Sequence, residues 1–598
     1  MKRKWMGILM SVVLAGSLLY GCGSNGTVAA QSGSAEEAKE NQEDAQASES
    51  ESTADGDEMF TDRDYETDYE ESESVSIVLS DSGIEAGDGV SVENATATIT
   101  AEGTYVVSGS LSDGQLIVDA DESAKIHLVF NNVEISSADS APVYIKQADK
   151  VFLTLADGTA STLATSGTFA ETGEEEDKID AVIFSKADLT LNGNGSLQVT
   201  TDSGNGITSK DDLVLTSGSY IVSAGNHGLE GKDSVRIAAG AYTITAGNDG
   251  IHSDNSEDAD KGFVYIADGE LTINAADDGV HAEHNVTIDG GTITVSDGYE
   301  GIEGMTIDIN GGTINVAVSD DGLNAAGGND GSGMQGGDFS DMQMQGGMMR
   351  QNEEQSDGTA QEMPQSANAQ GGTSESYIRI TGGTITIDAG GDGIDSNGGL
   401  YVSGGETYVS GPTNSGNGAL DYNGTGEITG GIFVAAGASG MAMNFSDSST
   451  QGSILVTTSA AQTGAVVLTD ADGTELLRFT PTKEYGSVLI SIPEIASDGT
   501  YTVAMGEETQ EITMDGLLYG TGSGMGGPGN RQDGANGTGG EMMTPPDGME
   551  LPDGTGTMEP PDGDSTMQQP NGQFGGRGGG PGGQGGPGGQ GGQTDSGE

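Results

Sequence analysis

A three-residue phrase recurs through the middle of the chain and restricts the possible folds more than any other feature. It consists of a polar residue, usually acidic or amide, then a glycine, then an aliphatic residue, as in Asp249-Gly250-Ile251. Two further phrases, a glycine that opens a strand and a three-residue apolar run, keep the same step. A period between 20 and 50 residues indicates a solenoid, a propeller or another array. The glycines of the first phrase follow at steps of 22, 22, 29, 22 and 21 residues, at Gly206, Gly228, Gly250, Gly279, Gly301 and Gly322, and Gly393 continues them.

The local pattern within one repeat selects among these architectures. Short runs such as Thr292-Ile293-Thr294-Val295 alternate with a period of two residues, which is typical of strands. Glycine, Asp and Asn fill the segments between the runs, where they favour turns. No stretch carries an apolar stripe of helical period. The sequence therefore predicts an all-β chain folded as a parallel β-helix with coils of about 22 residues.

Changes in composition along the chain predict its domains. Residues 75–450 form the parallel β-helix, interrupted at 327–374 by a Gly-, Met- and Gln-rich insertion without a period. Residues 451–516 contain hairpin-like strands, which we expect to form a small antiparallel cap over the last coil. Residues 517–598 are rich in Gly, Pro and Gln. We expect the insertion and this tail to be disordered.

The first 74 residues carry the features of an exported, anchored protein. Met1-Lys2-Arg3-Lys4 is basic, and residues 6–20 are mostly apolar but too short to span a membrane. Residues 1–21 therefore predict a signal peptide, and Leu19-Tyr20-Gly21-Cys22 resembles a bacterial lipobox. Cys22 is the single cysteine of the chain, so we interpret it as a lipid attachment site that anchors the protein at the cell surface. Residues 22–74 are acidic and poor in β-branched side chains, which predicts a disordered tether.

The charge of the chain limits its partners. Its 94 acidic and 20 basic residues give a formal net charge of −74. Nucleic acid is excluded as a partner, because phosphate binding requires a basic surface. An anionic polymer needs a bridging divalent cation to approach such a surface. We expect the protein to be a monomer, since each repeat of a solenoid contacts only its neighbours.

Equivalent residues of successive coils stack about 4.8 Å apart, so the repeat can be read as columns. One column contains Tyr220 and Tyr242, followed by aliphatic residues, and we expect it to point inward with the two rings stacked. The next column is polar and faces solvent. It reflects either the β-propensity of threonine or a flat docking surface for an extended polysaccharide. Its members are Thr243, Thr272, Thr294, Asn315 and Thr386.

Two further columns, immediately before and shortly after the turn glycines, are acidic. Adjacent carboxylates repel one another unless they are neutralised, and clustered oxygen ligands suit calcium. Alternatively, the same acids cap backbone amides in the turns and hold no metal. Four histidines, His227, His252, His281 and His284, lie in the same region, so a zinc site is an alternative, although their spacing matches no known zinc motif. The candidate calcium ligands are Asp249, Asp254, Asp258, Asp260, Asp277, Asp278, Glu300, Glu303, Asp320, Asp321, Asp392 and Asp395.

Four segments resemble the clostridial carbohydrate-binding lipoprotein family. They are Ala101–Gly109, Phe184–Leu189, Gly231–Ser234 and Asp258–Ile266, and the resemblance covers roughly residues 75–516 apart from the insertion. It implies a right-handed parallel β-helix similar to that of pectate lyases. It also implies binding of calcium, cellulose and acidic sugars.

Three classes of function remain open on the sequence. The first, which we favour, is a noncatalytic protein that binds cellulose or acidic glycans such as polygalacturonate. The second is a calcium-dependent, pectate-type lyase, which needs a base to remove a proton from the sugar. Lys210 and Lys232, one repeat apart beside the acidic columns, form the plausible basic pair, although they suit structural salt bridges equally well. The third is a structural adhesin without a defined glycan.

Overall fold

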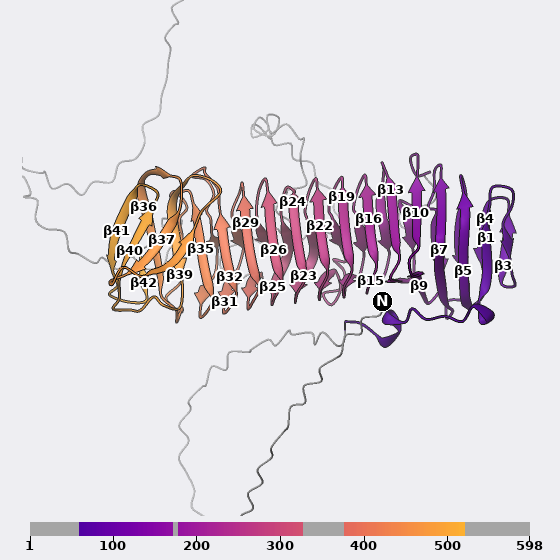
Figure 1. The fold of residues 1–598 in the computed structure, drawn as a ribbon, viewed down its shortest axis with the longest axis horizontal. Coiled ribbons are helices and arrows are strands. Elements are labelled where there is room, and N and C mark those ends of the chain that lie inside the picture. The colour runs from indigo at the N-terminus through magenta and orange to yellow at the C-terminus, as the bar shows by residue number, and fades with distance from the viewer. Residues whose placement is uncertain (1–58, 171–177, 327–375, 521–598) are drawn as a thin grey trace, which may run out of the picture. The chain divides into compact units, whose positions relative to one another are not determined.

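The structure is a computed structural model that describes residues 59–170, 178–326 and 376–520. Within these residues the chain winds into a parallel β-solenoid of about 11 turns, followed by an antiparallel sheet. The predicted parallel β-helix and antiparallel C-terminal sheet are confirmed. Figure 1 shows the strands of successive coils lying side by side in chain order. Among the described residues, no helix has the length and apolar character required to cross a membrane.

Each coil contributes one strand to each of three stacks, which we call face 1, face 2 and face 3. Strands β23 (Val280–Ile288) and β25 (Ile302–Ile309) run across both face 2 and face 3. Face 1 contains β10 (Ala160–Thr165), β13 (Ser196–Thr201), β16 (Ser219–Ala224), β19 (Ala241–Ala246), β22 (Glu270–Ala275), β24 (Thr292–Asp297), β26 (Thr313–Val318), β29 (Thr384–Ala389), β32 (Glu406–Ser410) and β35 (Ile432–Gly437).

The strands of face 2 are the shortest, and those of face 3 follow them in each coil. Face 2 contains β8 (Val143–Gln147), β11 (Ala181–Ser185), β14 (Asn205–Ser209), β17 (Leu229–Gly231), β20 (Ile251–Ser253), β27 (Leu323–Ala325), β30 (Ile394–Ser396) and β33 (Asp421–Tyr422). Face 3 contains β9 (Lys150–Leu155), β12 (Asp188–Gly193), β15 (Asp212–Leu215), β18 (Ser234–Ile237), β21 (Phe263–Ile266), β28 (Tyr377–Ile380), β31 (Gly399–Val402) and β34 (Gly426–Ile428).

Both ends of the solenoid carry less regular strands. At the N-terminal end, β3 pairs antiparallel with β4, and β7 reaches across two faces to pair with β9 and β10. These strands are β1 (Val75–Leu79), β2 (Glu85–Ala86), β3 (Val90–Glu93), β4 (Thr96–Ile99), β5 (Gly103–Leu111), β6 (Gln115–Asp119) and β7 (Lys125–Ser137).

At the C-terminal end, β39 (Tyr485–Ser491) lies antiparallel between β35 and β36 (Ser453–Gln462) and so terminates the parallel stacking. Beyond it, β37 (Val466–Asp470), β38 (Glu475–Phe479), β40 (Thr500–Met505) and β41 (Glu508–Thr513) form a separate four-stranded sheet. The last described strand, β42 (Leu518–Tyr519), pairs with β36. Residues 517–520, which we predicted to belong to the tail, are therefore part of the described fold.

The interior of the solenoid is a continuous column of aliphatic side chains, to which the strands of all three faces contribute. Val235, Val264, Val286 and Ile307 occupy one register on face 3, and each is fully buried. Full burial of such a side chain stabilises the fold by about 1.5–3 kcal/mol relative to exposure. Tyr220 and Tyr242 are buried with ring centroids 5.2 Å apart and planes 7° apart, which confirms the predicted internal stack.

The two glycine phrases serve two different purposes. Gly218 and Gly240, which open strands, have φ angles of +111° and +121°, a conformation that other residues rarely adopt. The glycines of the first phrase are required for close approach instead. A Cβ on Gly250 would lie 2.4 Å from Cγ2 of Ile273 and 2.7 Å from the carbonyl oxygen of Gly279 in the next coil. Coil-to-coil spacing therefore excludes a side chain at this position.

A 16-residue segment, residues 59–74, lies against the outside of face 3, and we call it the N-terminal strap. It contains the short 3-10 helices η2 (Asp62–Tyr65) and η3 (Glu71–Glu73). Asp64 is buried, pairs with Lys150 at 2.9 Å and accepts a hydrogen bond from Oγ1 of Thr190 at 2.7 Å. These partners hold the pKa of Asp64 at about 2, although burial alone would raise it.

The prediction of a disordered tether over residues 22–74 is therefore wrong for the strap. Composition did not reveal it because the strap is held by contacts with residues distant in the sequence, among them the polar contacts of Asp64 and the ring contact of Phe60 with Tyr265. Arg236 also donates to the carbonyl oxygen of Met59 at 3.0 Å. Residues 22–58, the insertion 327–374 and the signal segment with Cys22 lie outside the described residues.

The Gly250 contact predicts a large cost for a single methyl group. We expect Gly250→Ala to lower the free energy of unfolding by about 2 kcal/mol, since the coils must separate to admit the Cβ. Thermal and denaturant unfolding measure the change. Gly516→Ala is the matched control, because a Cβ there meets no atom within 4 Å. Equal stability of the two variants would contradict the close-approach account.

The strap predicts a local change in protease sensitivity. Removal of the buried Asp64 carboxylate leaves Lys150 and Thr190 without their partner, so Asp64→Ala should weaken strap attachment by about 3 kcal/mol. Limited trypsin digestion should then cut after Arg63 much faster than in the parent protein. The matched control is Asp62→Ala, which removes an exposed carboxylate from the same 3-10 helix. Identical cleavage rates in both variants would refute the anchoring role of Asp64.

Candidate functional site

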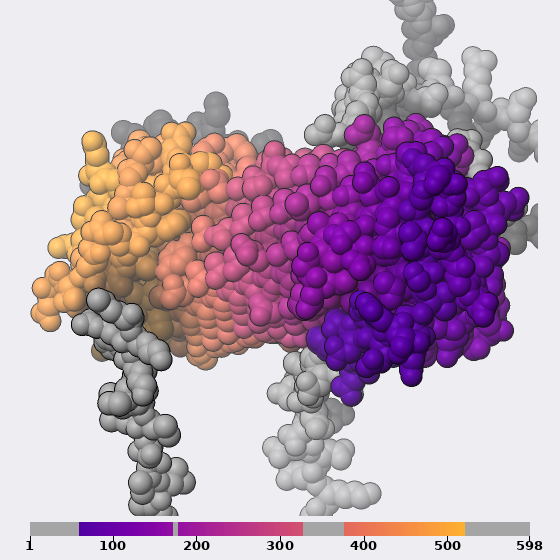
Figure 2. All heavy atoms as spheres, turned by 45° about the vertical axis from the view of Figure 1, so that its right-hand side comes forward, coloured from indigo at the N-terminus to yellow at the C-terminus, as the bar shows by residue number. Residues whose placement is uncertain are grey.

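The residues of the predicted threonine column are stacked on the outside of face 1. The register pairs Thr243 with Thr272, Thr272 with Thr294, Thr294 with Asn315, and Asn315 with Thr386. Thr243, Thr272 and Thr386 are exposed, and Thr294 and Asn315 are half-buried. Figure 2 shows one side of the solenoid, on which successive coils form bands in chain order. Face 1 thus presents in-register hydroxyl groups to solvent, and their role in carbohydrate binding stays a prediction.

The two predicted turn columns lie side by side along face 2. The column after the glycines runs through Glu230, His252, His281, Glu303 and Asn324, each paired in register with the next. Contacts such as that between His281 and Asp278, three residues earlier, join it to the column before the glycines. Most of these side chains are buried; Asp249, Asp278, Glu300 and Glu303 are 4%, 3%, 1% and 1% exposed. The columns therefore belong to the interior of a turn and not to the open surface.

The column before the glycines binds backbone amides of the following coil. Oδ1 of Asn205 accepts from the amide N–H of His227 at 3.1 Å, and Oδ1 of Asp249 accepts from that of Asp278 at 3.1 Å. Oδ1 of Asp321 likewise accepts from the amide N–H of Asp392 at 2.5 Å. These bonds satisfy buried donors between coils. They support the alternative in which the turn acids bind backbone amides, here the amides of the following coil.

At the N-terminal end of the two columns, Glu230 is neutralised by protein groups. It pairs with Lys210 at 2.9 Å and accepts hydrogen bonds from Thr208 at 2.9 Å and from Asn205. Burial lowers the pKa of Lys210, but Glu230 outweighs this effect and raises it above its ordinary value. Lys210 is therefore a protonated structural cation, whereas a lyase requires a neutral base. Lys232, one coil further, is exposed.

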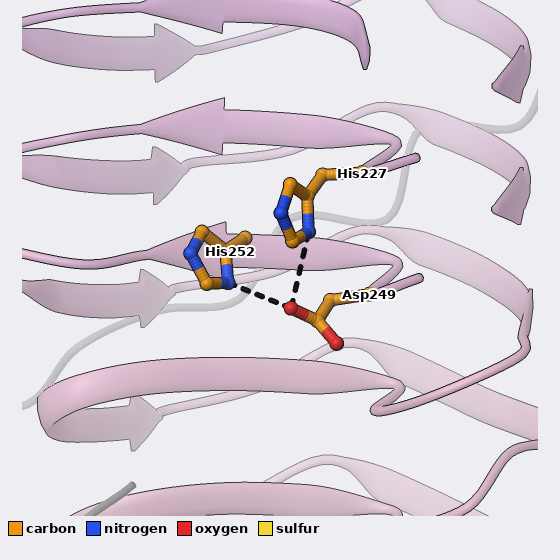
Figure 3. A group of neighbouring side chains, drawn as sticks. All are labelled: His227, Asp249 and His252. Carbon is orange, nitrogen blue, oxygen red and sulfur yellow. Dashed lines mark ion pairs between the residues drawn. The ribbon is translucent and has the colours of Figure 1, made fainter. Parts of the chain in front are cut away.

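In the next coil, two histidines converge on one aspartate (Figure 3). Nδ1 of His252 lies 2.7 Å and Nδ1 of His227 lies 3.1 Å from Oδ2 of Asp249. The two rings are stacked with centroids 4.0 Å apart and planes 18° apart. Asp249 is buried, and the histidine side chains are 13% and 14% exposed. Burial raises the pKa of Asp249, but the two histidines lower it well below its usual range.

One coil further, a second cluster contains two carboxylates and one histidine. Nδ1 of His281 lies 2.5 Å from Oε2 of Glu303 and 3.2 Å from Oδ2 of Asp278, in hydrogen-bonding geometry. These bonds raise the pKa of His281 to about 11, although burial alone would lower it. Burial, the neighbouring Asp249 and Glu303 raise the pKa of Asp278 to about 8 despite its bond to His281. This cluster thus carries an internal ion pair.

At the C-terminal end, the columns contain a group of carboxylates, those of Asp320, Asp321, Asp392 and Asp395. Burial, Asp392 and Asp320 raise the pKa of Asp321 to about 8, and Asp395 adds to the effect. Burial raises the pKa of Asp392 to about 6, against the opposing hydrogen bond from Gly418. A Cβ on Gly391 would lie 2.1 Å from Oδ1 of Asp320 and 2.3 Å from Oδ1 of Asp321. The carboxylate oxygens of this acidic cluster therefore crowd together above a glycine.

The remaining predicted calcium ligands do not join these groups into one site. Asp254, Asp258 and Asp260 are exposed in the loop between β20 and β21, where Oδ1 of Asp258 accepts from the amide N–H of Asp260. Glu300 accepts a hydrogen bond from Asn324 at 2.8 Å. Asp277 is half-buried beside Asp278. The predicted set is thus split among two His-containing clusters, one acidic cluster and a loop, and Asp277 and Glu300 lie outside all four.

A groove of about 350 Å³ on face 3 was not predicted. It lies over β21, β23, β25 and β28, and Met59 of the strap forms part of its wall. Phe263, Tyr265, Asn285, Asp308 and Arg379 also line it. The hydroxyl of Tyr265 donates to Asp289 at 2.6 Å, and Arg379 lies 3.6 Å from Asp308.

The signal for this groove was present in the apolar three-residue runs. Their middle residues, Tyr265, Thr287, Asp308 and Arg379, point outward and are in register. Tyr401, 39% exposed, continues the row on the next coil. The middle positions predicted no site because no single repeat contains both an aromatic and a cation there. The groove depends on their juxtaposition across coils.

A β-solenoid with outward polar columns and a lined groove defines a class of proteins that present regular surfaces to extended ligands. A family model described as "Carbohydrate-binding domain-containing protein" matches residues 93–343 and 305–418, which together exceed half of the chain. The chain therefore belongs to this family. The expected carbohydrate-binding family is confirmed, whereas lipidation, calcium and the particular sugars stay predictions.

Two relatives accompany this match. A carbohydrate-binding domain-containing protein of Acetivibrio thermocellus is 39% identical over 137 residues, 23% of this chain and 48% of that protein, so the match spans about half of the relative. The solved structure of a polysaccharide lyase-like protein from C. thermocellum, a gadolinium derivative, shares 37% identity. It covers 42% of this chain and 98% of its own, with a TM-score of 0.37.

The acidic cluster predicts a pH-dependent stability. A carboxyl whose folded pKa is raised binds more protons in the folded than in the unfolded state, so unfolding becomes easier as pH rises from about 4 to about 8. At pH about 4 we expect Asp321→Asn and the parent protein to have the same free energy of unfolding. At pH about 8 the free energy of unfolding of the variant should be higher by about 1 kcal/mol, allowing for solvent screening. Thermal unfolding in EGTA measures the difference. A stability difference that does not change with pH would contradict the assignment.

Proposed function

We propose that the protein is a noncatalytic surface lipoprotein that binds an extended polysaccharide along its solenoid. The carrying observation is the in-register outer row of face 3, in which the groove residues continue from coil to coil. Membership of a carbohydrate-binding family supports the same ligand class. An extended chain of sugars suits such a row, because each coil adds one outward side chain in register with that of the preceding coil.

The chemistry of the groove favours a sugar as its occupant. The aromatic ring of Phe263 lines the groove and offers an apolar face for the C–H groups of a pyranose. Asn285 and Asn310 provide hydrogen-bonding groups for hydroxyls. Arg379 and Lys261 already pair with Asp308 and Asp233. Neutral cellulose therefore fits this groove better than a free polyuronate.

Calcium is the proposed cofactor, and the acidic cluster at the C-terminal end of face 2 fits it best. Asp320, Asp321, Asp392 and Asp395 provide hard oxygen donors, and two of the oxygens converge above Gly391. Burial, together with neighbouring carboxylates, raises the pKa values of Asp321 and Asp392. Bound calcium would neutralise these carboxylates and connect an acidic glycan to the surface. We accordingly propose binding to polygalacturonate that depends on calcium.

The state of Lys210 supports a noncatalytic protein over the lyase alternative. Its ammonium group is paired with buried Glu230 and kept protonated, so it is a poor base. Lys232, the second candidate, is exposed. For the cell-surface location we rely on the predicted lipid anchor at Cys22. We propose a monomer with polysaccharide as its partner.

Retention on insoluble polysaccharide tests this function. We expect the protein to bind cellulose with or without EGTA, and polygalacturonate only with calcium, without generating the ultraviolet absorbance of unsaturated products. Arg379→Gln and Tyr401→Ala should each weaken cellulose binding about tenfold, or ~1.4 kcal/mol. Thermal unfolding of each variant verifies the fold.

Variants of the threonine face serve as reciprocal controls. If Thr243→Ala and Thr272→Ala reduce binding while the groove variants retain it, the ligand lies on face 1 as the sequence predicted. Growth of product absorbance that is lost in Lys210→Ala would establish the lyase. Failure to bind any polysaccharide would overturn the proposal in favour of the adhesin.

A further inference from the structure

We propose that His227, Asp249 and His252 form a binding site for a divalent transition-metal ion such as zinc. The inference concerns face 2 and is independent of the sugar-binding proposal. One nitrogen or oxygen atom from each residue, Nδ1, Oδ2 and Nδ1, lies within 4.8 Å of the other two. Figure 3 shows the three side chains directed toward one another from adjacent coils.

The fold places these donors by its own register. His227 and Asp249 hold the same position in successive coils, immediately before Gly228 and Gly250. His252 follows Asp249 by three residues and pairs in register with Glu230. Oδ1 of Asp249 is fixed by the amide N–H of Asp278, which leaves Oδ2 for the histidines. The site is therefore built on strands and turns that other interactions already hold.

The contacts inside the cluster have ion-pair distances but lack hydrogen-bonding geometry. Nδ1 of His252 and Nδ1 of His227 approach Oδ2 of Asp249 to 2.7 and 3.1 Å, yet both nitrogens are shielded from solvent and neither makes a hydrogen bond. Buried polar atoms normally find a partner, and leaving them unsatisfied is costly. A cation held between the three atoms supplies the missing partner for both nitrogens.

A purely ionic interpretation is less favourable. Two imidazolium rings stacked 4.0 Å apart would repel each other, and one carboxylate can neutralise only one of them. Glu230, which pairs in register with His252, is already bonded to Lys210 and Thr208. Neutral imidazoles that direct lone pairs to a metal avoid this repulsion.

The donor set selects the class of metal. Two imidazole nitrogens and one carboxylate oxygen are typical of zinc and its transition-metal neighbours, whereas calcium prefers oxygen donors alone. Tetrahedral bonds of about 2.0–2.1 Å separate neighbouring donor atoms by roughly 3.3 Å, close to the distances within the cluster. The histidine side chains are 13% and 14% exposed.

The neighbouring cluster of Asp278, His281 and Glu303 shows the contrast. There the single histidine hydrogen-bonds to both carboxylates and needs no further partner for Nδ1. Similar residue types thus form an internal ion pair around His281, whereas the Nδ1 atoms of His227 and His252 lack hydrogen bonds. The proposed metal site is therefore confined to His227, Asp249 and His252.

Cobalt(II) and zinc titrations of the chelator-treated full-length protein test the site. We expect one equivalent of Co²⁺ to develop visible d–d absorption that Zn²⁺ displaces and excess Ca²⁺ does not. His252→Gln and Asp249→Asn should each weaken Zn²⁺ binding by about tenfold or more. The Asn variant keeps an Oδ1 acceptor for the amide of Asp278, so it should remain folded. Zn²⁺ should also raise the unfolding temperature of the parent by mass action.

His284→Gln is the matched control, because His284 lies in the same region but outside the cluster. This variant should retain the cobalt spectrum and the zinc affinity. A parent protein without d–d absorption, or folded His252→Gln and Asp249→Asn variants with unchanged zinc affinity, would overturn the site. Displacement of cobalt by calcium would equally contradict it.

Discussion

Close stacking of one coil on the next is the constraint on which the rest of the structure depends. The carbonyl oxygen of Gly279 and the side chain of Ile273 occupy the space that a Cβ of Gly250 would need, so the turn position must be glycine. The coils then pair in register on three faces, and residues separated by one period become neighbours. Every outward surface is consequently a column of equivalent residues, and the ligand chemistry follows from what each column contains.

The same stacking creates an electrostatic difficulty on face 2, because like residues are placed above like residues. The chain resolves it differently along the columns. Lys210 neutralises Glu230 at one end, and His281 bridges Asp278 and Glu303 in the middle. At the other end, burial and the neighbouring carboxylates raise the pKa of Asp321, which favours its uncharged form. Buried acids are costly unless paired or protonated, so these positions are where a cation stabilises the fold most.

The period of the sequence was sufficient to predict the coil, its three strand runs and the contents of the outward columns. Thr243 and Thr272, or Glu230 and His252, are neighbours because they occupy the same phase of the repeat. The period did not indicate which column members are buried. It therefore gave a single set of calcium ligands, where hydrogen bonding divides the acids into separate groups.

Interactions that break the period were beyond prediction. Asp64 contacts Thr190, 126 residues later in the chain, through a strap whose acidic composition suggested a tether. The groove of face 3 likewise combines Tyr265 with Arg379, which lie on non-adjacent coils. Neither residue is informative within its own repeat. Tyr265 and Arg379 are close because the coils stack. The insertion between β27 and β28 lengthens the sequence between them, but the strands on either side of it keep their register.

The central claim, that a repeating outer surface binds an extended polysaccharide, is tested most directly by the dependence of affinity on ligand length. Isothermal titration of a series of cello-oligosaccharides from the disaccharide to the hexasaccharide measures it. Because each added sugar meets another coil of the face 3 row, affinity should rise steadily along the series and fall in Arg379→Gln. An affinity that is constant from the disaccharide onward would show a single local subsite and would contradict the account.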